Sequence, residues 1–529
     1  MARTEGRGAE VAGTPARLRA DALALALLLA QGAALLAALW GLVRSPLSFD
    51  EQWRAYYVSL GTGLWDQLHT SSAPFTAGWV GLEQAAAALL GTTEWGLRLP
   101  MALAIPATAL ATYRLGRRWL RPPAAFLVAA ALAVDGSVLV YGLLLKPFVF
   151  DGFWTVVATL LWLRLDEGGG RWPLRTLGHL ALGLVTVAAV PTVLVLAPLL
   201  VLGLVRADRE GWRRWLGQLG LSALTALVAA VHLLVFIAPQ TRVLAAPYWV
   251  DHFAPVDQGA AAVVRFVGRQ LAGYVPELAT STYLDPDVAD PLWQQATKTS
   301  PAPGLGLLVS AALLVALAAG AAACLRRRDG RALLAAVAGA LAGELAGALL
   351  HKWPFGLVRA NLFLLPLLYV LAAVGAARLV GAAWPVGATR SPRPSLPRWV
   401  AVPAALLVAA AIVVAGGYGV RNLASLQQRW DAPGLATEVR AAVAVVRTSA
   451  ATDDLVIVTG DQRGWSWYMD RYRGYPALVD RSPRIPAGQT LHAALFRPTQ
   501  LDPFLAAHHQ AINLFVFEFV YETGSAPAA

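Results

Sequence analysis

The chain has 529 residues, of which 57% are hydrophobic and only 14% are charged. This balance excludes a soluble globular protein of ordinary composition. The 43 Lys and Arg residues outnumber the 32 Asp and Glu residues and give a formal charge of +11. Most of these cations stand in short clusters between apolar runs, which the positive-inside rule explains without a nucleic-acid partner.

Residues 1–19 carry four arginines and precede an apolar run that extends from about 20 to 43. The run is longer than the apolar core of a signal peptide and lacks a convincing cleavage site. We therefore expect residues 1–19 to form a cytoplasmic tail and the run to be a retained first span.

Arginine clusters then alternate with pairs of apolar runs through the predicted membrane domain, residues 20–420. A helix of about twenty residues matches a hydrocarbon core of roughly 30 Å, and the clusters mark cytoplasmic loops. The pattern predicts a polytopic α-helical membrane protein with about 11 spans. We place them at 20–43, 96–116, 123–142, 147–164, 175–189, 191–206, 216–238, 304–325, 332–350, 360–378 and 399–419.

Pro191 interrupts one long apolar stretch, which fits either two short spans or a single kinked helix. The regular alternation of arginine clusters favours two spans. A single helix would move every later loop, and the C-terminal region, to the opposite side of the membrane.

On this topology two loops, residues 44–95 and 239–303, lie outside the cytoplasm. The first contains two amphipathic segments, Gln52 to Leu64 and Phe75 to Leu90, of the kind that lies in the membrane interface.

The C-terminal region, residues 421–529, changes character and lies on the same external side. Helical and strand patterns alternate along it, which predicts a small extracytoplasmic α/β domain. The predicted elements are a helix at Ala436 to Val446, a strand at Leu455 to Val458, an aromatic helix at Trp465 to Tyr472 and a strand at Asn513 to Val520.

Two adjacent carboxylates, Asp50 and Glu51, follow the first span within a few residues. A carboxylate held at the membrane surface can act as a general base toward an acceptor hydroxyl. An ordinary helix start is the alternative, because acidic residues favour the first turn.

Together with later motifs, this pair resembles the Asp-Glu motif of the GT-C glycosyltransferases, which include protein O-mannosyltransferases and the aminoarabinose transferases that modify lipid A. Leu144, Phe148 and the segment Ser71 to Phe75 depart from that pattern. The later motifs are Glu94-Trp95-Gly96-Leu97-Arg98-Leu99-Pro100, Arg114-Leu115-Gly116-Arg117-Arg118, Tyr141 through Lys146-Pro147-Phe148, and Trp353-Pro354-Phe355-Gly356 with Arg359.

The resemblance implies a polyprenyl-phosphate sugar donor held in the bilayer and a one-step, inverting transfer at the outer face. The acceptor would be a hydroxyl of an envelope glycan, lipid or protein. Asp50 would be the base and Glu51 its support. Cations stabilise a leaving phosphate, and the candidates for binding substrate are Arg54, Tyr57, Lys146, Lys352 and Arg359.

We expect no cofactor and no metal, because the sequence has no metal-binding signature and no nucleotide-binding motif. Asp135, Asp151, His232 and Glu344 fall in or near predicted spans, where we favour structural roles over functional ones. Two other functions stay open. One is a transporter or lipid flippase, although we find no internal repeat. The other is a non-catalytic partner in envelope assembly.

Overall fold

The computed structural model describes most of the chain up to residue 383 and short pieces beyond it. The described residues are 15–47, 49–59, 64–65, 75–167, 172–241, 252–280, 303–356, 359–383, 402–403, 406, 439, 441–445, 455–459, 465, 467–468 and 514–518.

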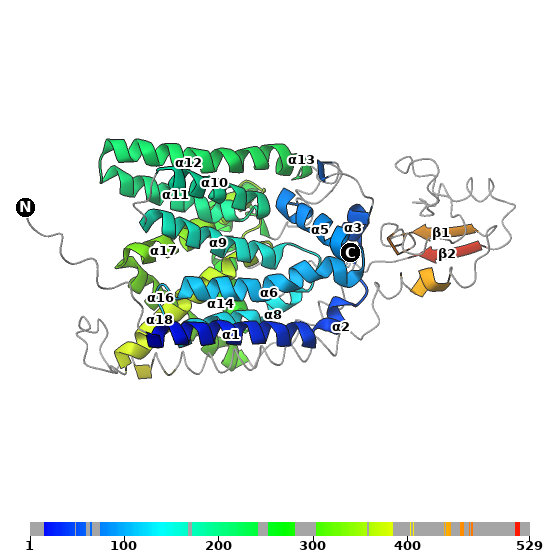
Figure 1. The fold of residues 1–529 in the computed structure, drawn as a ribbon, viewed down its shortest axis with the longest axis horizontal. Coiled ribbons are helices and arrows are strands. Elements are labelled where there is room, and N and C mark those ends of the chain that lie inside the picture. Colours follow the sequence, from blue (N-terminus) through cyan, green and yellow to red (C-terminus); the bar gives the residue numbers. More distant parts are fainter. Residues whose placement is uncertain are drawn as a thin grey trace, which may run out of the picture.

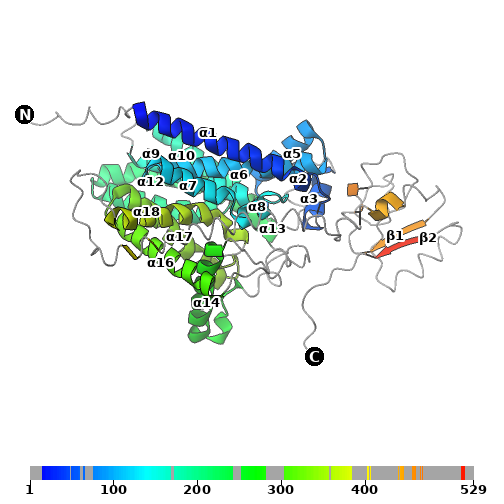
Figure 2. The same cartoon turned by 90° about the horizontal axis from the view of Figure 1, so that it is seen from below.

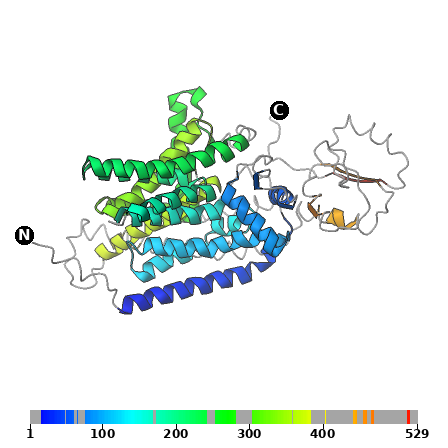
Figure 3. The same ribbon diagram turned by 45° about the horizontal axis from the view of Figure 1, so that its top comes forward.

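This part of the chain is mostly helical. Most of its long helices run side by side in one bundle (Figures 1 and 3), and the helix Ala260–Thr280 projects from it (Figure 2). The long helices are α1 (Pro15–Ala38), α6 (Glu94–Gly116), α7 (Pro122–Ala133), α9 (Phe148–Glu167), α10 (Trp172–Ala188), α11 (Thr192–Asp208), α12 (Trp212–His232), α14 (Ala260–Thr280), α16 (Pro303–Leu325), α17 (Arg328–Leu349) and α18 (Leu365–Ala383). The shorter helices α2 (Trp40–Val43), α3 (Phe49–Ser59) and α5 (Ala77–Leu90) lie together at the end that faces the strands (Figures 1 and 2).

The remaining described elements are short. They are α8 (Gly136–Gly142), the π-helical turn η1 (Leu233–Ile237), α13 (Ala238–Thr241), the 3₁₀ turns η3 (Val256–Gln258) and η4 (Arg359–Leu364), and strands β1 (Leu455–Thr459) and β2 (Leu514–Glu518).

Five of the described helical segments are long and apolar enough to cross a membrane alone, or up to six if α7 and α8, which meet at 54°, form one broken span. The five are Leu18–Ala38, Phe148–Glu167, Trp212–Gln240, Arg328–Leu349 and Arg359–Gly381. The chain is therefore built to be embedded in a membrane. The count of about eleven spans remains a prediction, and most of the last predicted span, 399–419, lies outside the described residues.

Arginine clusters from distant parts of the sequence meet at one end of the bundle. Arg206, at the end of α11, and Arg328, at the start of α17, share Asp166, with nitrogen–oxygen distances of 2.5 and 3.3 Å. Arg118 pairs with the neighbouring Glu167. The chain enters the bundle at this same end, where α1 begins (Figure 1). We call it the arginine end.

The chain reverses direction at Pro191. Arg175 Nη2 donates to Gln218 Oε1 at 2.8 Å, and one turn along, His179 Nδ1 lies 3.0 Å from Thr225 Oγ1. The residue numbers rise together in these two contacts, so α10 and α12 are parallel. Helix α11 must run back between them, and the structure therefore has two helices here, as the arginine pattern predicts.

Small residues bring α16 and α18 into close backbone contact. A Cβ atom on Gly320 would collide with the carbonyl oxygen of Leu371, and one on Gly375 would collide with the carbonyl oxygen of Ala316. Close approach at small residues is a common way for helices to associate in lipid. These two glycines thus fix how α16 packs against α18.

Both predicted strands of the C-terminal region are present, and they pair with each other. Strands β1 and β2 are parallel, with Leu455 opposite Leu514 and Thr459 opposite Glu518. The described residues of the two predicted helices, 439 with 441–445 and 465 with 467–468, are helical. The α/β domain as a whole stays a prediction.

Candidate functional site

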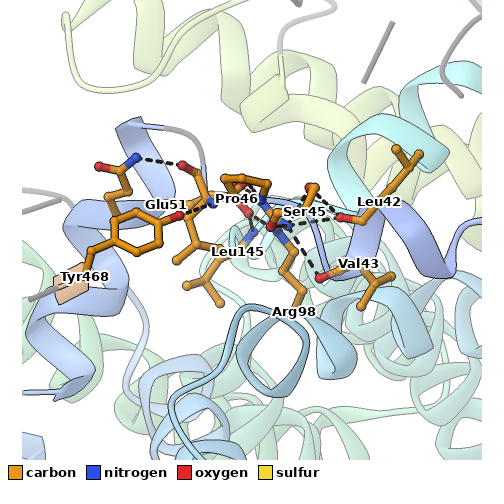
Figure 4. A network of polar contacts seen from close by, with 10 residues as sticks. Leu42, Val43, Ser45, Pro46, Glu51, Arg98, Leu145 and Tyr468 are labelled. Atoms are coloured by element: carbon orange, nitrogen blue, oxygen red, sulfur yellow. Dashed lines mark hydrogen bonds and ion pairs between the residues drawn. The ribbon is translucent and has the colours of Figure 1, made fainter. Parts of the chain in front are cut away.

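The start of α3 is held by a buried ion pair between Glu51 and Arg98 (Figure 4). Glu51 Oε1 lies 2.7 Å from Arg98 Nε, and Glu51 Oε2 lies 2.7 Å from Arg98 Nη2. Both side chains are fully buried. Two parallel hydrogen bonds between a guanidinium and a carboxylate are stronger and more directional than a single contact. Glu51 is thus neutralised by Arg98.

Arg98 also organises the turn that leads into α3. Its Nη1 donates to the carbonyl oxygens of Leu42 at 3.0 Å and Ser45 at 2.6 Å, and its Nη2 donates to Pro46 at 2.9 Å. Glu51 Oε1 in turn accepts the backbone N–H of Leu145 at 2.9 Å. This one pair therefore joins α2, the turn before α3, α6 and the segment that precedes Lys146.

A second buried ion pair lies one turn further along α3. Arg54 Nε donates to Glu83 Oε2, and both side chains are fully buried. The Arg54 guanidinium carbon lies 4.9 Å from the ring centroids of both Phe75 and Trp79. Burial raises the pKa of Glu83 to about 7, although the positive charges of Arg54 and Lys146 oppose that shift. Glu83 thus titrates close to neutral pH.

Two further predicted cations, Lys146 and Arg359, lie over aromatic rings. Lys146 Nζ lies 5.8 Å from the centroid of Phe75, the ring that Arg54 also contacts. Arg359 Cζ lies 5.8 Å from the centroid of Phe148, two residues after Lys146. Three of the four cations predicted to bind phosphate therefore lie in this region, because Arg54 and Lys146 share the Phe75 ring and Arg359 contacts the ring that follows Lys146 by two residues. We call them the cation group.

The cation group lies at the end of the bundle away from the arginine end. Helix α9 starts at Phe148, beside Lys146 and Arg359, and it ends at Glu167 among the clustered arginines. The sequence predicted this separation of the two sets of cations.

The other predicted site residues have varied surroundings. Asp50 lies in the first turn of α3, and its side chain is outside the described part of the structure. Tyr57 is half-buried and packs edge-on against Tyr56, with ring centroids 5.7 Å apart. Lys352 is exposed, and within the described residues no ion pair, ring contact or side-chain hydrogen bond joins it to the cation group.

Two of the four ionisable residues in or near the predicted spans, Asp135 and His232, make contacts that suit structural roles. Asp135 caps α8 by accepting the Ser137 N–H at 2.9 Å, and it also accepts the Tyr369 hydroxyl at 2.7 Å. His232 Nε2 accepts the Ala77 N–H at 3.3 Å. Asp151 and Glu344 are buried within α9 and α17. In the part of the chain that the structure describes, no three His, Cys, Asp or Glu residues are grouped to hold a metal ion.

Sequence reasoning assigned no role to Arg98 or Glu83, although both complete the site. Arg98 stands between Leu97 and Leu99, and Glu83 interrupts the apolar run of α5. A charge placed among apolar residues needs a partner of opposite sign when it is buried. Applying this rule to Arg98 and Glu83 would have identified both as candidate members of buried ion pairs.

No family model matches the chain, and no curated protein sequence matches it. Similar solved structures include the ArnT protein of Cupriavidus metallidurans in the apo state, with a TM-score of 0.49 and 14% identity, covering 93% of this chain and 89% of that one. The same protein bound to undecaprenyl phosphate gives 0.48 and 14%, covering 94% and 89%. An Archaeoglobus fulgidus oligosaccharyltransferase tethered with an acceptor peptide gives 0.48 and 15%, covering 84% of this chain and 62% of that one.

Proposed function

We propose that the chain is a membrane glycosyltransferase of the GT-C type, which moves a sugar from a polyprenyl-phosphate donor to a hydroxyl of an envelope acceptor. The observation that carries this proposal is that Arg54, one turn after Asp50 in α3, shares the Phe75 ring with Lys146, while Arg359 lies over Phe148, two residues after Lys146. A general base and a group of cations at one end of a membrane bundle are what transfer from a lipid phosphate requires.

In the proposed reaction the acceptor oxygen attacks the anomeric carbon of the donor sugar. The bond from that carbon to the phosphate oxygen breaks, and configuration inverts. Asp50 takes the acceptor proton. The polyprenyl phosphate leaves with one additional negative charge, which Lys146 and Arg359 stabilise, while Arg54 is paired with Glu83.

The positive-inside rule gives the proposed orientation. With the arginine end in the cytoplasm, residues 1–19 are cytoplasmic and the cation group lies at the outer face. Residues 421–529 would then be the extracytoplasmic α/β domain that follows the membrane domain, residues 20–420. No nucleotide is needed on this side, because the donor arrives through the bilayer.

The purified protein in lipid vesicles, incubated with a radiolabelled polyprenyl-phosphate sugar and an envelope extract, tests the proposal. We expect label to pass into the extract and free polyprenyl phosphate to appear in equal amount. Movement of intact donor across the bilayer without cleavage would instead identify a flippase. If well-folded protein neither transfers label nor moves intact donor, the chain is a non-catalytic envelope partner.

A further inference from the structure

Three aromatic residues of the C-terminal region pack against the segment that holds Glu51. Trp465, Trp467 and Tyr468 are fully buried in one apolar cluster with Leu47, Ala55 and Val58. Residues from two distant parts of the chain thus share one small core. The C-terminal region therefore contacts the membrane domain directly at α3.

One hydrogen bond fixes the register of this contact. The backbone N–H of Leu47 donates to the Tyr468 hydroxyl oxygen at 3.0 Å, across 421 positions of sequence (Figure 4). The carbonyl oxygen of Leu47 accepts a hydrogen bond from Nε2 of Gln52 at 2.7 Å. The residue before Leu47 is Pro46, whose carbonyl oxygen Arg98 binds. Both the N–H and the C=O of Leu47 are thus hydrogen-bonded to side chains.

The Tyr468 hydroxyl is the hydrogen-bond acceptor for a buried backbone N–H. Leu47 is fully buried, so its N–H cannot exchange a lost protein partner for water without opening the cluster. Asp50 lies three residues later, at the start of the helix that Leu47 leads into. A shift of Leu47 would therefore move the turn that carries Asp50.

We propose that Tyr468 is a positioning residue, which couples the C-terminal region to the proposed catalytic turn by holding the backbone of Leu47. The link from Leu47 to Asp50 rests on the proposed function, whereas the link between Tyr468 and Leu47 does not. The C-terminal region then acts as a part of the transferase site and is not an independent module carried beside it.

The first test needs no activity. Tyr468→Phe keeps the ring and removes the hydroxyl, and we expect amide hydrogen exchange over residues 45–52 to become about 10-fold faster in the full-length protein. Tyr369→Phe is the matched control, because it removes one hydroxyl bonded to Asp135 and leaves the Leu47 turn intact. Unchanged exchange over residues 45–52 in Tyr468→Phe would overturn the coupling.

The second test asks whether the coupling acts through Asp50. We expect Tyr468→Phe to lower kcat about 10-fold with the donor KM unchanged, and to have no further effect when added to Asp50→Asn, because coupled residues are not additive. An equal loss in both backgrounds would overturn the positioning role. Faster exchange in a protein whose wild type transfers no sugar would leave the coupling standing and refute the proposed function.

Discussion

Glu51 binds Arg98 through both carboxylate oxygens, each 2.7 Å from a guanidinium nitrogen, with neither side chain exposed to solvent. This contact separates the roles of the two adjacent carboxylates at the start of α3. Glu51 is committed to Arg98 and to the backbone of Leu145. Its contribution is therefore to the structure of the site, and the proposed proton acceptor is its neighbour Asp50.

Removing the charge of Glu51 should destabilise the protein. In Glu51→Gln a buried guanidinium loses its counter-ion, and breaking a buried pair typically costs about 3–5 kcal/mol of unfolding free energy. Thermal or denaturant unfolding in detergent measures the effect. The same substitution in the exposed pair of Glu210 with Arg214 is the control and should change stability by less than about 1 kcal/mol. Equal stabilities for the two variants would contradict this role of Glu51.

Lys146 should matter to donor use more than Lys352. Lys146 is half-buried within the cation group, whereas Lys352 is exposed outside it. A hydrogen bond to a charged group contributes about 1.5–3 kcal/mol, so Lys146→Ala should raise the donor KM about 10- to 100-fold. Steady-state rates at varied donor concentration provide the check. A larger KM rise in Lys352→Ala would assign the phosphate to the late loop and refute the cation group.

Glu83 should make stability fall as pH rises. Its pKa in the folded protein is about 7 against 4.5 for the free side chain, so between these values the folded state binds more protons than the unfolded state. The unfolding free energy therefore declines from about pH 4.5 to about 7 by the amount that this group contributes. Glu83→Gln removes the titration, and the pH slopes of the two proteins should differ in this window. Identical slopes would show that Glu83 ionises normally.

Much of the helical architecture could be predicted because it depends on local chemistry. Apolar runs bounded by arginines predicted the helices, and the alternation of the arginine clusters predicted the reversal at Pro191. The strands were predicted from the short apolar runs near Leu455 and Leu514, and the structure confirms both as β1 and β2.

The partners within the site could not be predicted in the same way, because they depend on how distant segments pack. Arg98 lies 47 positions from Glu51, and Glu83 lies 29 positions from Arg54. The Tyr468 contact spans 421 positions. Hydropathy and residue spacing do not specify which of several charged or hydroxyl groups will meet once the helices associate.

The proposed reaction requires the carboxylate of Asp50 to take the proton of the acceptor hydroxyl during sugar transfer. The decisive measurement is the transfer rate of Asp50→Asn compared with wild type, using radiolabelled polyprenyl-phosphate sugar and equal amounts of folded protein. We expect the rate to fall by about 10²–10⁴, the usual cost of losing a general base, with the unfolding temperature unchanged. Full transfer by Asp50→Asn would exclude Asp50 as the general base.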